Sequence, residues 1–199
     1  MLRCNRKYIF IHIPKTGGSS IEKELKYKHS HLDHAHYCTS KEYKECFVFT
    51  VIRNPYDRVV SDYKWSQVND DPPDMKQLFE GKPFDYFVKT FYNIKLEDIQ
   101  HWKKVKKRPG WYNMHYLTHC RSQVSMLHPV GNIDYFIRFE NLQEGFNVVC
   151  SKLGRPVTQL PHVNKCPGKH YTEYYNDETR QIVTEMFKDD LDRFGYAYE

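Results

Sequence analysis

Residues 14–20 (P-K-T-G-G-S-S) place a lysine, two glycines and three hydroxyl side chains between an apolar run and a helix-forming stretch. Glycine lets backbone N–H groups turn inward and approach an anion, and a following helix adds the positive end of its dipole. The candidate contacts to such an anion are Lys15, Thr16, Gly17, Gly18, Ser19 and Ser20. This pattern indicates a site for a phosphate-like group, although a plain strand-to-helix turn with an incidental lysine would contain the same residues.

A second candidate anion site begins at Arg53, directly after the apolar run of residues 46–52. A guanidinium group binds phosphate oxygens in a planar, bidentate manner. Ser61 follows two helical turns later, where its hydroxyl can join Arg53 on the same anion. A surface salt bridge is the alternative for Arg53, but its place at the end of a buried strand favours ligation. Asp57 and Arg58 are expected to form a local ion pair on the solvated surface.

Neither stretch contains the Walker A pattern G-x-x-x-x-G-K-[ST], in which the lysine follows the glycines and a hydroxyl holds Mg²⁺. Here Lys15 precedes the glycines. We therefore expect both loops to bind anions without a metal ion, which argues against a nucleoside kinase. The histidines of residues 29–36 lack cysteine or carboxylate partners at helical spacing, so they predict no metal site either.

Both candidate sites lie where strands end in loops that lead to helices. The apolar, β-prone runs are residues 8–13, 46–52 and 133–139. A helix is expected over residues 140–153, and one final helix is expected from an N-cap at Asn176 or Asp177 to Gly195. This alternation predicts an α/β fold with a three-layer, P-loop-like parallel sheet flanked by helices, which binds ligands beyond the carboxyl ends of its strands. The length of 199 residues suits a single domain over residues 1–199.

Composition narrows the class of protein further. Aromatic residues make up 16% of the chain, which is typical of a folded domain, and the net charge of +5 favours anionic ligands. No fold signature for nucleic-acid binding is recognisable, so no nucleic-acid partner is expected. No apolar run is long enough for a membrane span or a signal peptide, and a cytoplasmic location is expected. The six cysteines form no C-x-x-C pair and are expected to be buried thiols in a reducing compartment.

The two motifs together, F-I-H-I-P-K-T-G-G-S-S and F-T-V-I-R-N-P-Y-D-R-V-V-S-D-Y, resemble the two nucleotide-binding motifs of the sulfotransferase superfamily. The branch they most resemble includes the carbohydrate sulfotransferases. The likeness continues in residues 133–142 and 160–165 and in the terminal F-G-Y, so it covers nearly the whole chain. It implies that residues 15–20 hold the 5′-phosphosulfate of 3′-phosphoadenosine 5′-phosphosulfate (PAPS), and that Arg53 and Ser61 hold its 3′-phosphate. Residues 66–114 match nothing in the family pattern, and acceptor specificity is expected there.

A sulfuryl acceptor hydroxyl must lose its proton, and histidine is the natural base near neutral pH. The uronosyl 2-O-sulfotransferases have a similar H-x-H that includes their base, which implies His36, or His34, in this chain. A solvated, histidine-rich loop is the alternative. A second polar set is expected to contact the acceptor or its sulfate: His115, His119, Arg121 and Gln123.

The resemblance therefore predicts an enzyme that moves a sulfuryl group from PAPS to a hydroxyl, which we expect to belong to a carbohydrate. The product nucleotide would be adenosine 3′,5′-bisphosphate (PAP), and Lys15 would stabilise charge on the leaving phosphate. A module of the same fold that binds nucleotides or polyanions without catalysis is the alternative. The oligomeric state is left open.

Overall fold

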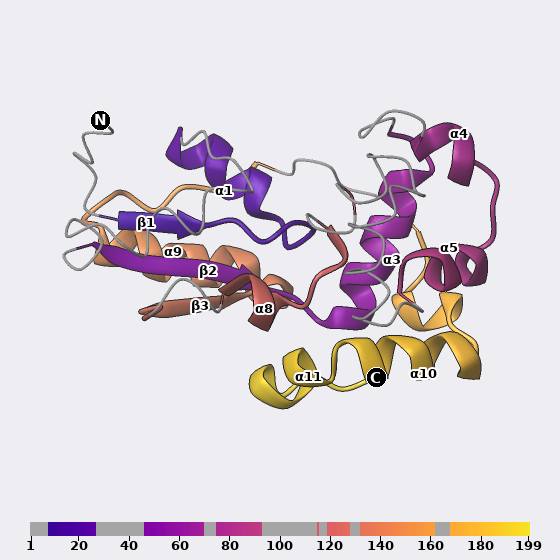
Figure 1. Cartoon of the computed structure of the whole chain (residues 1–199). Helices are drawn as coiled ribbons and strands as arrows, with labels where there is room; N and C mark the ends of the chain where they lie inside the picture. Colours follow the sequence, from indigo (N-terminus) through magenta and orange to yellow (C-terminus); the bar gives the residue numbers. More distant parts are fainter. Residues whose placement is uncertain are drawn as a thin grey trace, which may run out of the picture. The chain divides into compact units, whose positions relative to one another are not determined.

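The computed structural model describes residues 8–26, 46–69, 75–92, 115, 119–127, 132–161 and 168–199, drawn in colour in Figure 1. The chain divides into two compact units. Unit 1 comprises Met1–Arg53 and Gln123–Lys165, and unit 2 comprises Asn54–Ser122 and Cys166–Glu199. Each unit combines two separate stretches of chain, and the single domain predicted over residues 1–199 stays a prediction.

Unit 1 is built on a parallel sheet of three strands in the order β1-β2-β3. The strands are β1 (Tyr8–Ile11), β2 (Phe47–Ile52) and β3 (Tyr135–Arg138), with Tyr8 opposite Phe47 and Phe49 opposite Tyr135. Branched and aromatic side chains dominate all three, as expected for strands in a buried sheet. The predicted fold class, an α/β protein with a parallel sheet flanked by helices, is confirmed.

The core of unit 1 lies on one face of this sheet. Phe10, Phe49, Val51 and Ile137 project from the strands into it. Helix α1 (Gly18–Leu25) and helix α9 (Leu142–Lys152) cover it with their own apolar side chains, Ile21, Leu25, Phe146, Val149 and Cys150. Alternate strand residues such as Ile11, Val48 and Ile52 are also buried, so both faces of the strands are shielded from solvent. Unit 1 also contains α8 (Gln123–Leu127) and the short helix η4 (Phe139–Asn141).

Unit 2 is helical, and its longest helix, α3 (Pro55–Ser66), begins directly after β2. Asn54 caps α3 by accepting a hydrogen bond from Tyr56 N at 3.0 Å, and Pro55 occupies the first helical position, where no donor is needed. The other helices are α4 (Met75–Phe79), α5 (Phe84–Phe91), η5 (Tyr171–Tyr174), α10 (Asp177–Met186) and α11 (Lys188–Phe194). Their aromatic side chains, among them Tyr56, Phe79, Phe87, Phe91 and Phe187, form a second core.

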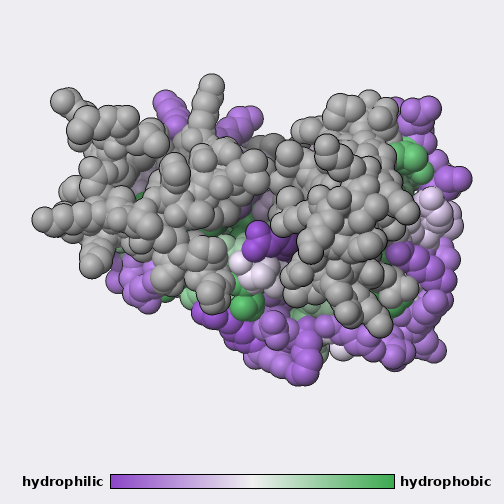
Figure 2. Space-filling model, viewed as in Figure 1, coloured by the Kyte–Doolittle hydropathy of each residue, from purple (hydrophilic) through white to green (hydrophobic). Residues whose placement is uncertain are grey.

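The C-terminal region differs from the prediction of one final helix. Asn176 does cap α10, accepting from Thr179 N at 2.8 Å. The helix then stops, and α11 begins after Phe187, whose φ of −113° and ψ of 24° are not helical. Phe187 is 1% exposed, so burial of its ring in the second core accompanies the break. The outer surface over α10 and α11 is largely hydrophilic in Figure 2, as expected for helices that cover a core on one side.

Among the described residues, no helix is long and apolar enough to cross a membrane. Cys120 and Cys150 are buried thiols outside any disulfide. Cys4, Cys38 and Cys166 lie outside the described residues.

Candidate functional site

The first phosphate-binding candidate is a tight turn between β1 and α1. Lys15 has a positive φ of 68° and Gly17 one of 81°, and Gly17 is the N-cap of α1. A Cβ on Gly18 would lie 2.2 Å from Cδ2 of His12, so only glycine fits there. His12 is 4% exposed, and a hydrogen bond of 2.9 Å between its Nδ1 and Glu22 Oε1 fixes its ring. The sequence therefore creates a tight turn at the start of a helix, with glycines where the rings of His12 and Phe139 approach the backbone closely, and the N-terminus of α1 suits a bound anion.

The hydroxyl groups of this turn have different surroundings. Thr16 is fully buried, and its Oγ1 donates to Ile13 O at 2.7 Å. That bond uses the only hydroxyl proton of Thr16, which leaves the backbone N–H as its donor to any phosphate. Ser19 is half-buried and Ser20 is buried. The nucleotide contacts predicted for residues 15–20 stay predictions.

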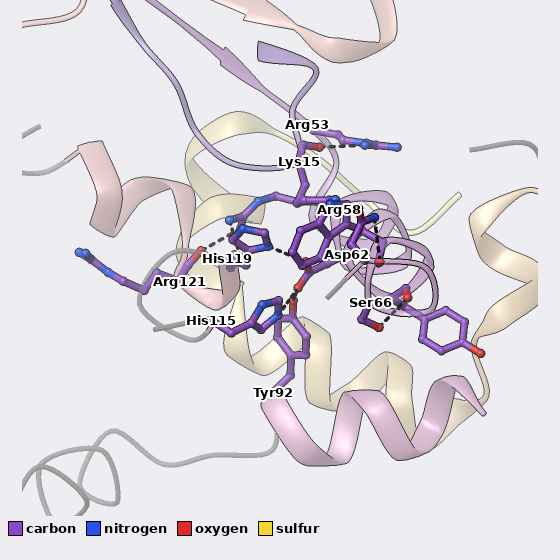
Figure 3. Close-up of polar contacts among 12 residues, drawn as sticks. Lys15, Arg53, Arg58, Asp62, Ser66, Tyr92, His115, His119 and Arg121 are labelled. Carbon is purple, nitrogen blue, oxygen red and sulfur yellow. Dashed lines mark hydrogen bonds and ion pairs between the residues drawn. The ribbon is translucent and has the colours of Figure 1, made fainter. Parts of the chain in front are cut away.

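Arg53, at the end of β2, meets this turn within unit 1. Its Nη1 donates to Lys15 O at 2.8 Å (Figure 3). Its guanidinium carbon lies 4.0 Å from the centre of the Phe139 ring. The side-chain amide of Gln123 fixes the Arg53 backbone on both sides, accepting from its N at 3.0 Å and donating to its O at 2.9 Å. The structure thus brings together the cationic residues of the two motifs, Lys15 and Arg53, and it gives Gln123 a positioning role at the strand end.

Ser61, the other predicted contact to the 3′-phosphate, lies half-buried on α3 in unit 2. The anion that it was predicted to share with Arg53 would join residues of different units, and this pairing stays a prediction.

Unit 2 contains a buried cluster of polar side chains around Asp62, the residue after Ser61. Asp62 Oδ2 accepts hydrogen bonds from Tyr92 Oη and His115 Nε2, each at 3.0 Å. Asp62 Oδ1 accepts from His119 Nδ1 at 2.8 Å (Figure 3). One carboxylate on α3 therefore organises a tyrosine from the end of α5 and two histidines four residues apart.

These contacts shift the acidity of the buried groups. Burial alone would favour the neutral acid, but the neighbouring imidazoles of His115 and His119 outweigh it and hold the Asp62 pKa well below its ordinary value. Burial, together with the charge of Asp62, raises the pKa of the Tyr92 hydroxyl well above its usual range. The same two causes, burial first, raise the pKa of the Cys120 thiol. Asp62 is therefore an anion at neutral pH, whereas Tyr92 and Cys120 are neutral.

Arg58 does not form the surface ion pair expected from the sequence, because it is 2% exposed. Its Nη2 donates to His119 O at 2.7 Å and its Nη1 donates to Arg121 O at 2.8 Å. Arg58 and Asp62 are four residues apart on α3, so they share one face of the helix. Arg58 therefore holds the backbone carbonyl of His119, and Asp62 holds its imidazole.

The predicted acceptor contacts therefore occupy different surroundings. His115 and Gln123 are fully buried, whereas His119 and Arg121 are partly exposed. His34 and His36, the predicted base candidates, lie outside the described residues. Sequence reasoning missed Arg58, Asp62 and Tyr92; the spacing of four residues in the pairs Arg58/Asp62 and His115/His119 was the available signal.

Asp62, His115 and His119 also form a set of side chains that could hold a metal ion, since their ligand atoms lie within 4.8 Å of one another. Two imidazoles and a carboxylate are a common set of zinc ligands. The two oxygen–nitrogen separations of 2.8 and 3.0 Å are those of direct hydrogen bonds, which account for the cluster as it stands.

Comparison with known proteins gives one match. A family model described as the sulfotransferase family matches residues 3–197, nearly the whole chain. Neither the search of curated proteins nor that of solved structures gave a match.

Proposed function

Because the chain belongs to the sulfotransferase family, we propose that it transfers a sulfuryl group from PAPS to a hydroxyl group of a carbohydrate. The observation that best supports the donor is the contact between Arg53 Nη1 and the Lys15 backbone carbonyl, which joins the two motifs beyond the carboxyl ends of β1 and β2. The N-terminus of α1 offers backbone donors to a doubly anionic phosphosulfate, and the adjacent Arg53 offers a positive charge to a second anionic group. The proposal assigns residues 15–20 to the 5′-phosphosulfate and Arg53 with Ser61 to the 3′-phosphate.

The reaction follows from the chemistry of the donor. The acceptor oxygen attacks sulfur opposite the bridging oxygen, a new O–S bond forms, and the S–O bond to the phosphate breaks. The departing electrons collect on the phosphate of PAP, where Lys15 and the N–H groups of the loop stabilise them. The hydroxyl proton passes to a base, and the resemblance assigns this base to His36 or His34. No step of this reaction uses a metal ion.

A carbohydrate acceptor is proposed from the motifs that resemble carbohydrate sulfotransferases, together with the net positive charge of the chain. Many sulfated glycans carry uronate groups, so a positively charged protein favours their approach.

Transfer of radiolabel from PAPS tests this function directly. The protein is incubated with labelled PAPS and a panel of acceptors: chondroitin, heparosan, a simple phenol and no acceptor. We expect label in the polysaccharides and stoichiometric release of PAP. Binding of PAP without transfer of label to any acceptor would instead support the non-catalytic module.

A further inference from the structure

The Asp62 cluster brings one carboxylate and two imidazoles together within unit 2. Asp62 lies on α3, and His115 and His119 are four residues apart, a spacing that places two side chains on one face of a helix. The ligand atoms of the three side chains all lie within 4.8 Å of one another (Figure 3). Carboxylates and pairs of histidines at this spacing are recurrent zinc ligands. The cluster therefore has both the chemistry and the compactness of a three-ligand metal site.

The buried charge of Asp62 favours a cation at this position. Its side chain is 1% exposed, and no lysine or arginine in the described part of the chain forms an ion pair with it. Arg58, four residues before it, donates Nη1 and Nη2 to the carbonyl groups of Arg121 and His119 instead. Buried charges in proteins are paired with opposite charges or bind metal ions. Hydrogen bonds from neutral donors solvate this carboxylate, whereas a divalent cation would also compensate its charge.

The separations within the cluster are close to those of a zinc site. With bonds of about 2.0–2.2 Å, the ligand atoms of a tetrahedral ion lie about 3.3–3.6 Å apart. Asp62 Oδ1 and His119 Nδ1 are 2.8 Å apart, as suits a direct hydrogen bond, and no two of the three ligand atoms are separated by more than 4.8 Å. Side-chain shifts of about an ångström bring all three to the separations of a tetrahedral ion. Each neutral imidazole then binds the ion through the nitrogen that faced the carboxylate and carries its proton on the other nitrogen.

The surroundings of the cluster hold the ligands in place. Tyr92 Oη donates to Asp62 Oδ2 at 3.0 Å, the kind of hydrogen bond that orients a carboxylate bound to a metal. The Trp65 ring lies beside both imidazoles, with its centre 5.0 Å from that of His119 and 6.2 Å from that of His115. Apolar neighbours of this kind lower the local dielectric constant, which strengthens the attraction between an ion and its ligands.

One position of a tetrahedral ion is left for a ligand from outside the three side chains. Cys120 follows His119 in the chain but does not belong to the compact group, and its thiol hydrogen-bonds to Tyr92. The His119 side chain is 14% exposed, whereas His115 is 0% exposed. Water can therefore reach the ion from the side of His119.

We propose that Asp62, His115 and His119 bind one Zn²⁺ ion, with water as the fourth ligand. Two nitrogen ligands favour zinc over Mg²⁺ and Ca²⁺, which prefer oxygen. The ion joins the two histidines to α3 and compensates the buried carboxylate, and no step of sulfuryl transfer passes through it. The site stands apart from the proposed function, so its test needs neither donor nor acceptor.

Zinc titrations of EDTA-treated protein without a histidine tag test the site. Wild type should bind one equivalent of Zn²⁺ in competition with a chelating dye. Asp62→Asn, His115→Gln and His119→Gln should each lower the affinity by about 100-fold or more, since loss of a residue that only orients a ligand costs about 10–100-fold. Tyr92→Phe should fall in that smaller range. His170→Gln is the matched control and should keep the wild-type affinity, because His170 is an exposed histidine of the same unit.

The histidine-rich residues 29–36 are the competing site for the ion. A protein that combines His29→Gln, His31→Gln, His34→Gln and His36→Gln should keep the wild-type affinity for Zn²⁺. If instead the three variants of the Asp62 cluster keep that affinity, the proposal is wrong, and loss of zinc from the combined variant would then locate the ion in residues 29–36.

Spectroscopy of wild type alone covers the case in which variants fold poorly. Co²⁺ in place of Zn²⁺ should give the intense visible absorption of a tetrahedral ion, without the near-ultraviolet charge-transfer band of a thiolate ligand. X-ray absorption at the zinc edge should show two imidazoles and no sulfur. A thiolate band, fewer than two imidazoles, or wild type that binds no stoichiometric zinc would each overturn the proposal.

Discussion

At the scale of single residues, Arg53 is the most informative side chain, because its proposed ligand is the phosphate that distinguishes PAP from AMP. A charge-assisted hydrogen bond to phosphate contributes roughly 1.5–3 kcal/mol. We therefore expect PAP to bind wild type about 10–150-fold more tightly than AMP, and Arg53→Ala to remove most of that preference. Calorimetry with PAP and with AMP measures this difference in affinity for both proteins. Arg155→Ala, an exposed arginine of the same unit, is the control, and equal affinities of wild type for the two nucleotides would contradict the assignment.

Lys15 provides a second prediction at this scale. Its proposed charge acts on both the bound phosphate and the leaving group, so Lys15→Met should weaken PAP binding and also slow turnover at saturating donor. The positive φ of 68° makes Lys15→Gly a useful companion variant, because glycine relieves the backbone strain while removing the charge. Both variants should lose activity if charge is the cause. Full activity in Lys15→Gly would show that only the backbone of this position matters.

At the scale of elements, the close contact between the first loop and His12 makes the start of α1 sensitive to added volume. The Cβ of Gly18→Ala would lie 2.2 Å from the His12 ring, so either the ring or the helix start must move. Overpacking of this kind costs about 1–3 kcal/mol of folding stability, and it should also reduce PAP affinity because the N–H groups of the turn shift. Chemical denaturation and calorimetry on one sample measure both effects.

Gly154→Ala is the matched control for this substitution. Gly154 also belongs to unit 1 and has a positive φ of 63°, but no atom lies within 4 Å of the position of its Cβ. It should lose about 1 kcal/mol from backbone strain and keep its PAP affinity. Equal losses of PAP affinity in both variants would contradict the steric explanation.

The face of α3 that carries Arg58 and Asp62 gives a prediction about pH. The Asp62 pKa in the folded protein lies well below its ordinary value of 3.8, so folding is favoured by its ionised form. That contribution is present above the ordinary pKa and is lost as pH falls from about 4 through the lower folded-state value. Wild type should therefore be more stable than Asp62→Asn at pH 6, and the difference should shrink below pH 4. Urea titrations at a series of pH values test this; a difference that is unchanged at low pH would exclude ionisation as its cause.

At the scale of the whole molecule, the sequence predicts most of the fold of unit 1 and less of unit 2. Apolar runs of strand length before a glycine turn and before Arg53 are strong local signals, and β1, β2 and the two motif loops lie where they were expected. The break at Phe187 depends on burial of one ring in a core contributed by distant helices, which no local pattern reveals. The Asp62 cluster could not be predicted from local sequence patterns either, because Asp62 and His115 are 53 residues apart in the chain.

The last prediction treats the whole protein as a nucleotide-binding unit that needs no metal. Ligand that binds only the folded state stabilises it by mass action, by about 2.7 kcal/mol at a concentration of 100 times Kd. For a chain of this length the melting temperature should rise by about 5–10 °C with PAP. Since residues 14–20 and Arg53 offer N–H groups and cations rather than metal ligands, the rise should be the same in EDTA and in Mg²⁺. ATP with Mg²⁺ should give a smaller rise, because it lacks the 3′-phosphate that Arg53 and Ser61 are proposed to bind.

Melts with Mg²⁺ alone and with Zn²⁺ alone separate any effect of metal on the Asp62 cluster from the effect of nucleotide. A shift with PAP that EDTA abolishes and Mg²⁺ restores would contradict metal-free binding and would favour the chemistry of a kinase over sulfuryl transfer.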